Sequence, residues 1–184
     1  LIRPFKKYIL HKRPFVVLKL AISIDGHTAT SDGNSKWISN DYSRYMVHRM
    51  RSLCDGVMVG KNTVLVDDPA LTVRYEDFSE EVKDAFRKNS FRISGRDNFL
   101  LKSLLESNDI FTQSSNPVRI LFGLPETNHA GVQAFKDTNY LIFEKEGNRQ
   151  KLLDERKDVQ SFIDDYENGR LIFLPDMPHE EEIS

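Results

Sequence analysis

Cysteine is almost absent from this sequence. Cys54 is the single cysteine among 184 residues, so no disulfide can form within the chain. Disulfides persist in oxidising compartments and are rare where thiols are kept reduced, so we expect a reducing compartment and a cytoplasmic location. At a predicted helix end, Cys54 is expected to be packed rather than reactive.

The chain also lacks an excess of charge of either sign and has no long apolar run. Its 26 basic and 28 acidic residues leave a net charge of -2, which gives no general attraction to nucleic acid or anionic membranes. No apolar run approaches the length of a membrane span, and the N-terminus has no apolar signal core. We therefore expect a soluble domain of ordinary size, with neither nucleic acid nor membrane as a partner.

Short apolar runs bounded by turn residues predict a sheet. The nearly continuous run Phe15–Ile24 is typical of a strand buried on both faces, and Asp25-Gly26 closes it with a turn. Further strands are predicted at Val57–Val59, Val118–Phe122, Tyr140–Phe143 and Arg170–Leu174, with short extended pieces at Thr28–Thr30 and Leu71–Val73.

Helices are predicted between these strands. One begins near Ser39 or Asn40 and ends before Asp55-Gly56, with its core face formed by Tyr42, Tyr45, Met46, Arg49, Met50 and Leu53. Others are predicted at Lys61–Val66, Ser79–Asn89, Leu100–Ser107 and Gln150–Glu167. The alternation predicts an α/β fold, in which ligands bind at the carboxyl ends of the strands.

Two turns at those strand ends are candidate binding elements. Gly60-Lys61-Asn62-Thr63 follows a strand and opens a helix, which suits a phosphate but is also a common turn. Asp67-Asp68-Pro69 either stops a helix or binds ribose hydroxyls or a cationic group. A metal site is rejected, because no third acid or histidine lies at ligand spacing.

Several single side chains are further candidates. Arg51 and Arg74 flank this region and suit a phosphate, since guanidinium groups pair with it in a two-pronged geometry. Lys19 interrupts an apolar strand, which is costly unless it lies near a cleft or reaches solvent. Trp37 is either a core residue or a wall of a cofactor pocket. Four other residues are interpreted as surface or rim groups: His27, His48, Arg44 and Arg49.

Four motifs in order carry a family resemblance. The stretches RPFVVLKLAISIDG, NSKWI, HRMR and VGKNTVLVDDPALTVR, all within Arg13–Arg74, closely resemble the reductase domain of bacterial riboflavin biosynthesis proteins of the RibD type. The resemblance implies a dihydrofolate-reductase-like fold, with a mixed, mainly parallel sheet flanked by helices. It also implies NADPH-dependent reduction of 5-amino-6-(5-phosphoribosylamino)uracil to its ribityl product.

The resemblance assigns roles by position. Ala21, Trp37, Thr63 and Asp67 are expected to contact NADPH. Ser35, Arg51, Leu71 and Arg74 are expected to contact the phosphorylated pyrimidine substrate. Lys19 is expected near the sugar carbon that receives hydride, where it would polarise or protonate the developing alkoxide. Homodimers are usual in the family, and fusion to a zinc deaminase domain occurs in its bifunctional members.

The chain departs from the family pattern in three places. Gly123-Leu124 stands where the family usually has Asp-Ser, and the glycine-rich V-E-G-G-type segment near the family's C-terminus is missing. The third departure is the excursion at 75–116, which is longer than is typical of the family. Residues 1–12 are interpreted as a linker and 13–184 as the reductase domain, with a long excursion at 75–116. Two alternatives therefore stay open: a dihydrofolate-reductase-like enzyme for another pterin or pyrimidine, and a truncated, non-catalytic binding domain.

Overall fold

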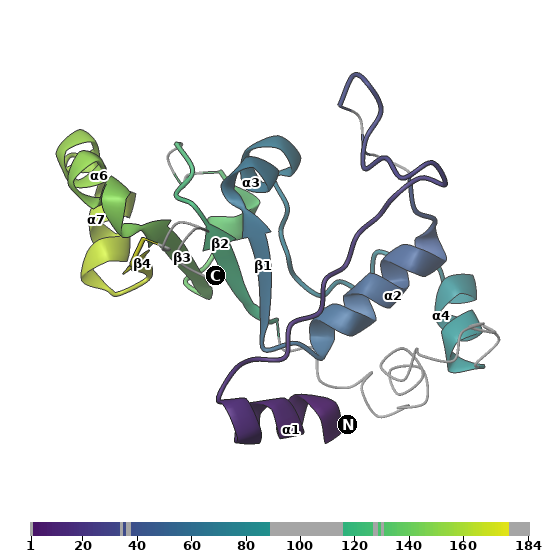
Figure 1. The fold of residues 1–184 in the computed structure, drawn as a ribbon. Helices are drawn as coiled ribbons and strands as arrows, with labels where there is room; N and C mark the ends of the chain where they lie inside the picture. Colours follow the sequence, from purple (N-terminus) through teal and green to yellow (C-terminus); the bar gives the residue numbers. More distant parts are fainter. Residues whose placement is uncertain are drawn as a thin grey trace. The chain divides into compact units, whose positions relative to one another are not determined.

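The computed structural model describes residues 2–33, 35, 38–88, 116–126, 129 and 131–176. The chain divides into two compact units (Figure 1). Unit 1 combines Leu1–Ser52 with Arg74–Ser114, and unit 2 combines Leu53–Val73 with Ser115–Ser184. The two units are described separately below.

Unit 2 is built on a four-stranded parallel sheet. Its strands are β1 (Gly56–Gly60), β2 (Val118–Phe122), β3 (Tyr140–Lys145) and β4 (Leu171–Leu174), in the order β1-β2-β3-β4. Gly60 lies beside Phe122, and Phe122 lies beside Phe143, so the strands end at one edge. The predicted α/β class, the parallel sheet and these four strands are confirmed.

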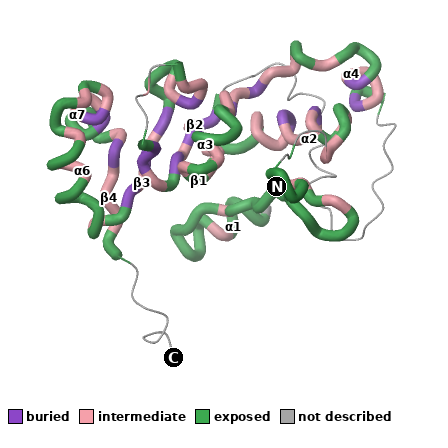
Figure 2. Tube along the Cα trace, turned by 90° about the horizontal axis from the view of Figure 1, so that it is seen from above, coloured by how far each residue is buried: buried purple, intermediate pink, exposed green. Residues whose placement is uncertain are grey.

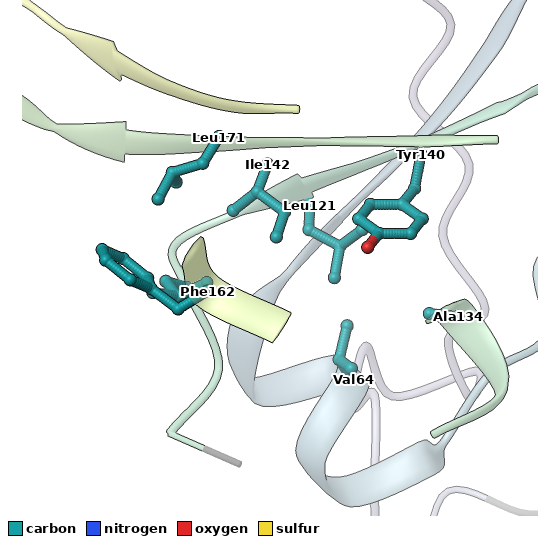
Figure 3. Packing of buried hydrophobic residues seen from close by; sticks show 8 residues of the cluster. Val64, Leu121, Ala134, Tyr140, Ile142, Phe162 and Leu171 are labelled. Carbon is teal, nitrogen blue, oxygen red and sulfur yellow. The ribbon is translucent and has the colours of Figure 1, made fainter. Parts of the chain in front are cut away.

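The core of unit 2 lies on one face of this sheet. Leu121, Ile142 and Leu171 occupy facing positions on neighbouring strands, and Figure 3 shows Val64 and Phe162 below them. Val64 comes from α3 (Lys61–Asp67) and Phe162 from α7 (Gln160–Glu167). Each apolar side chain that is fully buried in this way contributes roughly 1.5–3 kcal/mol relative to exposure.

The predicted single helix Gln150–Glu167 is wrong. The structure has α6 (Arg149–Arg156) and α7, separated at Val159, whose backbone is extended with φ -93° and ψ 105°. The break lets Leu152 and Phe162 pack against the same core cluster. Short 3-10 turns, η2 (Gln133–Phe135) and η3 (Glu146–Asn148), complete the connections.

Unit 1 contains α1 (Ile2–His11), α2 (Asp41–Ser52) and α4 (Glu80–Arg87). Residues 1–12, interpreted as a linker, thus include a helix, and α1 is exposed along almost its whole length (Figure 2). The predicted cap of α2 is confirmed, because Asn40 Oδ1 accepts the Ser43 N–H at 2.9 Å. Ser79 caps α4 in the same way, and its Oγ accepts the Val82 N–H at 3.4 Å.

Aromatic side chains form the core of unit 1. The ring of Tyr45 lies 4.7 Å from Phe86 and 5.2 Å from Phe78. Three expectations for α2 and the residues after it are wrong. Arg49 is buried with its guanidinium 5.9 Å from the Phe86 ring, so its place on the predicted core face is confirmed and its interpretation as a surface charge is wrong. Leu53 and Cys54, expected to be packed, are exposed.

The predicted buried strand Phe15–Ile24 is also wrong. Within the described part of the chain the segment has no regular structure and joins no strand, and Thr28–Thr30 forms none either. Val16, Leu18 and Leu20 are 75%, 80% and 62% exposed. An apolar run predicts an extended segment but cannot supply the partner that would pair its backbone. The turn that follows is confirmed, since the Gly26 N–H donates to the Ser23 carbonyl at 3.0 Å.

None of the helices in the described ranges has the length and apolar content needed to cross a bilayer.

Candidate functional site

In unit 2, a cavity of about 330 Å³ lies where the strands end. Lys61 directly follows β1, Leu124 lies just beyond β2, and Glu144 is near the end of β3; all three line the cavity. Residues of α6 line it as well. The cavity therefore occupies the edge of a parallel sheet at which ligands of α/β proteins bind.

Gly123 lies at this edge of the sheet, next to Lys61. Its φ is +89°, and its N–H donates to the Phe143 carbonyl at 2.8 Å. A Cβ at this position would lie 3.1 Å from Cδ of Lys61, so the glycine leaves room for the lysine stem. The Lys61 ammonium lies 3.8 Å from the carboxylate of Glu126. The side chain of Lys61 therefore passes directly beside Gly123.

The carboxylate of Glu144 binds the turns around the cavity. Its Oε2 accepts the Leu124 N–H at 2.8 Å, and its Oε1 accepts the Lys145 N–H at 2.8 Å and the Asn148 amide at 2.9 Å. Burial raises the pKa of Glu144, but these hydrogen bonds outweigh it and bring the pKa below its usual value. Glu144 is thus an anion whose acceptor atoms are occupied by the protein itself.

The rest of the cavity wall carries charges of both signs. Lys151 pairs with Glu155 at 3.8 Å, and the Arg156 guanidinium donates to the Pro125 carbonyl at 2.8 Å. Together with Lys61, these residues place three cations around the space. An anionic ligand could pair with them, because Lys61 and Lys151 form ion pairs with exposed carboxylates only at 3.8 Å, although the charge of Lys61 also acts on the buried Glu144.

The adjacent residues Asp67 and Asp68 have different surroundings. Asp68 ends α3 in the left-handed conformation at φ 41°, and its Oδ1 accepts the Gln133 N–H at 2.7 Å. Asp67, the last helical residue, is exposed. Thr63 is half-buried, and neither it nor Asp67 lines the cavity. The helix stop is confirmed and rests on Asp68, while Asp67 remains available for a ligand.

Leu71, an expected substrate contact, has an unusual backbone. It is buried, and its φ is +55°, a conformation that a non-glycine residue adopts at a cost of roughly 1–2 kcal/mol. Such strain persists only where the surrounding structure enforces it, and it gathers at functional sites. Leu71 is 6% exposed, so most of its side chain is already covered by the protein.

In unit 1 the structure brings Arg51 and Arg74 together around His48. The Nδ1 atom of His48 accepts the backbone N–H of Arg74 at 2.9 Å, and the Arg74 guanidinium pairs with Asp77 at 2.8 Å. Burial, followed by the charges of Arg51 and Arg74, lowers the pKa of His48 to about 4. The interpretation of His48 as a rim residue is therefore wrong, since it is only 8% exposed.

Lys19 and Ala21 line a second cavity within unit 1, of about 650 Å³. Asn40, Met46 and Phe86 also line it. Lys19 itself is exposed, as is Ser35, whereas Trp37 lies outside the described residues. The structure thus places two expected site residues on one cavity and two expected phosphate ligands around one histidine.

Three residues important to these sites were missed from the sequence: His48, Asp77 and Glu144. His48 follows Tyr45 by one helical turn, and this spacing could have indicated that it shares the buried face of α2. Glu144 carried no usable signal, because an acid at the end of an apolar strand usually faces solvent. Within the described part of the chain, no group of three potential metal ligands is found.

Known proteins resemble this chain over its central part. The family model of the RibD C-terminal domain matches residues 14–159. Riboflavin biosynthesis protein RibD of Mycobacterium tuberculosis is 50% identical over 74 residues, which are 38% of this chain and 22% of that protein. RibD of Haemophilus influenzae is 41% identical over 88 residues, 48% of this chain and 24% of that protein. The matches thus span less than a quarter of either relative.

A solved structure shows the same fold. The diaminohydroxyphosphoribosylaminopyrimidine deaminase/5-amino-6-(5-phosphoribosylamino)uracil reductase of Thermotoga maritima aligns with a TM-score of 0.51 and 23% identity. The alignment covers 94% of this chain and 41% of that protein. At this identity the likeness establishes the fold alone. With the family model matching well over half of its residues, the chain belongs to the RibD C-terminal domain family.

Proposed function

We propose that the chain is a reductase unit of riboflavin biosynthesis that uses NADPH to reduce 5-amino-6-(5-phosphoribosylamino)uracil to its ribityl product. One observation carries this proposal beyond family membership: Arg51 and Arg74 both act on the buried His48. Two guanidinium groups at one place suit a doubly charged phosphate. A substrate without phosphate would not need such a pair.

The cavity of unit 2 is the proposed binding site for the nucleotide cofactor. It lies at the carboxyl edge of a parallel sheet, and Lys61, Lys151 and Arg156 line it. These cations could pair with the phosphate groups of NADPH, although Glu126, Glu144 and Glu155 line the same cavity. Thr63 and Asp67 on α3 of the same unit are proposed as further contacts, and Ala21 and Trp37 of unit 1 stay predictions from the sequence. Bound NADPH would supply the hydride for the reduction.

The protein's own part in the reaction is to bind, orient and polarise. Arg51 and Arg74 would hold the substrate phosphate, with Ser35 and Leu71 as further contacts. The ammonium of Lys19 would donate a hydrogen bond to the sugar oxygen as negative charge develops on it. Positioning two bound molecules against each other can account for a large share of such a rate enhancement.

The test is NADPH consumption by the full chain. Absorbance loss is followed with 5-amino-6-(5-phosphoribosylamino)uracil and, in parallel, with the same compound lacking phosphate. We expect turnover of the phosphorylated compound only. In the double variant Arg51→Ala/Arg74→Ala, turnover of the phosphorylated compound should fall to the level of the compound without phosphate. Arg87→Ala is a matched control, because Arg87 is an exposed arginine of unit 1 that pairs with Glu80 and Asp84. Equal turnover of both compounds would favour a reductase for another pterin or pyrimidine.

One observation favours a second candidate, a domain that binds its ligands without turnover. Phe15–Ile24 carries Lys19 and Ala21 but pairs with no strand in the described part of the chain. An ammonium on an unpaired segment is poorly fixed for catalysis. NADPH binding without consumption, measured by calorimetry and by absorbance in the same sample, would support this candidate. Homodimer formation and fusion to a deaminase domain remain further proposals for the complete protein.

A further inference from the structure

We infer that His48 is a positioning residue: its neutral ring accepts the Arg74 N–H and thereby holds Arg74 for binding the phosphate of the substrate. The inference rests on the proposed function, because it names a residue that prepares the proposed phosphate site. His48 would not touch the substrate. It would act through Arg74, and its loss would weaken the recognition of phosphate more than the recognition of the rest of the ligand.

The geometry gives Arg74 two restraints. At its backbone, the N–H donates to His48 Nδ1 at 2.9 Å, and at its side chain, Nε donates to Asp77 Oδ2 at 2.8 Å. Nε is one of several donor atoms of the guanidinium group. The histidine bond thus fixes where the Arg74 side chain begins, and the aspartate bond fixes its direction.

The histidine ring is itself held in place. His48 is 8% exposed and lies with its ring centroid 5.2 Å from that of Phe78 in an edge-to-face contact. It projects from α2, whose helical spacing also directs Arg51 to this region, three residues later. One more bond joins the same two segments, since the Tyr75 hydroxyl donates to Ser52 Oγ at 2.9 Å. A rigid ring can therefore determine the position of the Arg74 backbone.

Only a neutral histidine can perform this task. The charged groups that act on it are Arg51 on α2 and Arg74 and Asp77 on the segment that faces it. A protonated ring would have no free acceptor at Nδ1, and it would repel both arginines. Burial and the two arginines keep the pKa of His48 low enough for the ring to stay neutral at physiological pH. The same arrangement that gathers positive charge for a phosphate thus preserves the hydrogen bond.

The experiment compares variants that keep or remove the acceptor atom. His48→Asn places an amide oxygen near the position of Nδ1, while His48→Leu and His48→Phe remove the acceptor. His27→Leu is the matched control, because His27 is an exposed histidine of the same unit. Calorimetry on the full chain measures the affinity for 5-amino-6-(5-phosphoribosylamino)uracil and for its dephosphorylated counterpart, and circular dichroism confirms that each variant is folded.

We expect His48→Leu and His48→Phe to lose about three- to tenfold in affinity for the phosphorylated compound, as the loss of one neutral hydrogen bond predicts, with little change for the dephosphorylated one. His48→Asn and His27→Leu should keep the parent ratio of the two affinities. Loss of affinity for both compounds to the same extent would overturn the inference in favour of a general structural role. An unchanged ratio in the folded Leu and Phe variants would also overturn it.

A failure of the proposed function has a different signature. If the parent chain binds the two compounds equally well, the phosphate site is absent and both proposals fall. If the parent prefers the phosphorylated compound and the acceptor-free variants prefer it equally, only the role of His48 falls. Amide hydrogen exchange at Arg74 gives an independent reading, because this N–H should exchange faster in His48→Leu and remain protected in His48→Asn.

Discussion

The Glu144 carboxylate accepts the backbone N–H of Leu124 at 2.8 Å, across the carboxyl ends of β2 and β3. Its other oxygen accepts from Lys145 and Asn148. One buried anion therefore binds the backbone just beyond β2 and at the last residue of β3. Leu124, Glu144 and Asn148 line the cavity in unit 2, so the shape of the proposed cofactor site depends on a side chain that the cofactor need not touch.

Replacing Glu144 should destabilise unit 2. Glu144→Gln puts an amide donor where the protein already presents donors, and hydrogen bonds to a charged group are worth about 1.5–3 kcal/mol each. We expect a loss of free energy of unfolding of roughly 2 kcal/mol by urea denaturation at about pH 7. Because the folded pKa of Glu144 lies below its ordinary value, its contribution is present above that value and is lost as the pH falls through the folded pKa.

Glu155→Gln provides the comparison. Glu155 lines the same cavity, but it is exposed and meets Lys151 only at 3.8 Å. A pair of this kind contributes about 0–1 kcal/mol. Equal effects of the two substitutions on unfolding would contradict the role given to Glu144.

Substitution of Asp68 should lower stability, whereas substitution of the adjacent Asp67 should lower NADPH affinity. Asp68→Ala removes the acceptor for the Gln133 N–H and places alanine at φ 41°, so we expect a loss of about 2 kcal/mol in free energy of unfolding. Asp68→Asn keeps an acceptor and tolerates this backbone, so it should stay close to the parent. Asp67→Ala should leave stability nearly unchanged and weaken NADPH binding. Thermal melts with and without NADPH measure both effects, and a stability loss in Asp67→Ala as large as that in Asp68→Ala would count against this division.

Gly123 can be tested against a second glycine. Gly123→Ala and Gly131→Ala both place alanine at a positive φ, of +89° and +87°, and each should cost roughly 1–2 kcal/mol for the backbone. Only at Gly123 does the new Cβ meet another side chain, at 3.1 Å from Lys61. We therefore expect the first substitution alone to displace Lys61 and to reduce NADPH affinity in calorimetry. Equal NADPH affinities in the two variants would show that Lys61 is not held by the glycine.

Local patterns predicted the elements of unit 2 because each strand there carries its own signal. Val118–Phe122 and Tyr140–Phe143 are short apolar runs between turn residues, which is typical of strands buried in a parallel sheet. The caps at Asn40 and Ser79 were equally local, since each depends on one side chain and the N–H group three residues later. Such features need no knowledge of distant contacts.

The wrong predictions concern features that depend on distant partners. Phe15–Ile24 has strand composition, but pairing requires a neighbour that no local pattern identifies. The break between α6 and α7 at Val159 leaves the apolar period almost unchanged, so periodicity alone could not locate it. His48 was misjudged for a similar reason. Its burial results from contacts with Phe78 and Arg74, which lie thirty and twenty-six residues away in the sequence.

The low pKa of His48 predicts acid sensitivity of the fold. An unfolded histidine binds its proton near pH 6.5, whereas folded His48 does so only near pH 4. Between these values the unfolded state binds more protons, so stability rises with pH and is lost as the pH falls from about 6.5 towards 4. The loss from this residue should be on the order of 2 kcal/mol.

Urea denaturation at a series of pH values measures this loss, and the difference between the parent and His48→Asn isolates it. His129 shifts in the same direction, chiefly because it is buried, so the parent curve alone would combine both histidines. Asparagine does not titrate, and the variant should therefore lose less stability than the parent on acidification. Parallel curves for the two proteins would mean that folded His48 takes up its proton at an ordinary pH. The ring would then not be the neutral acceptor that holds the Arg74 N–H.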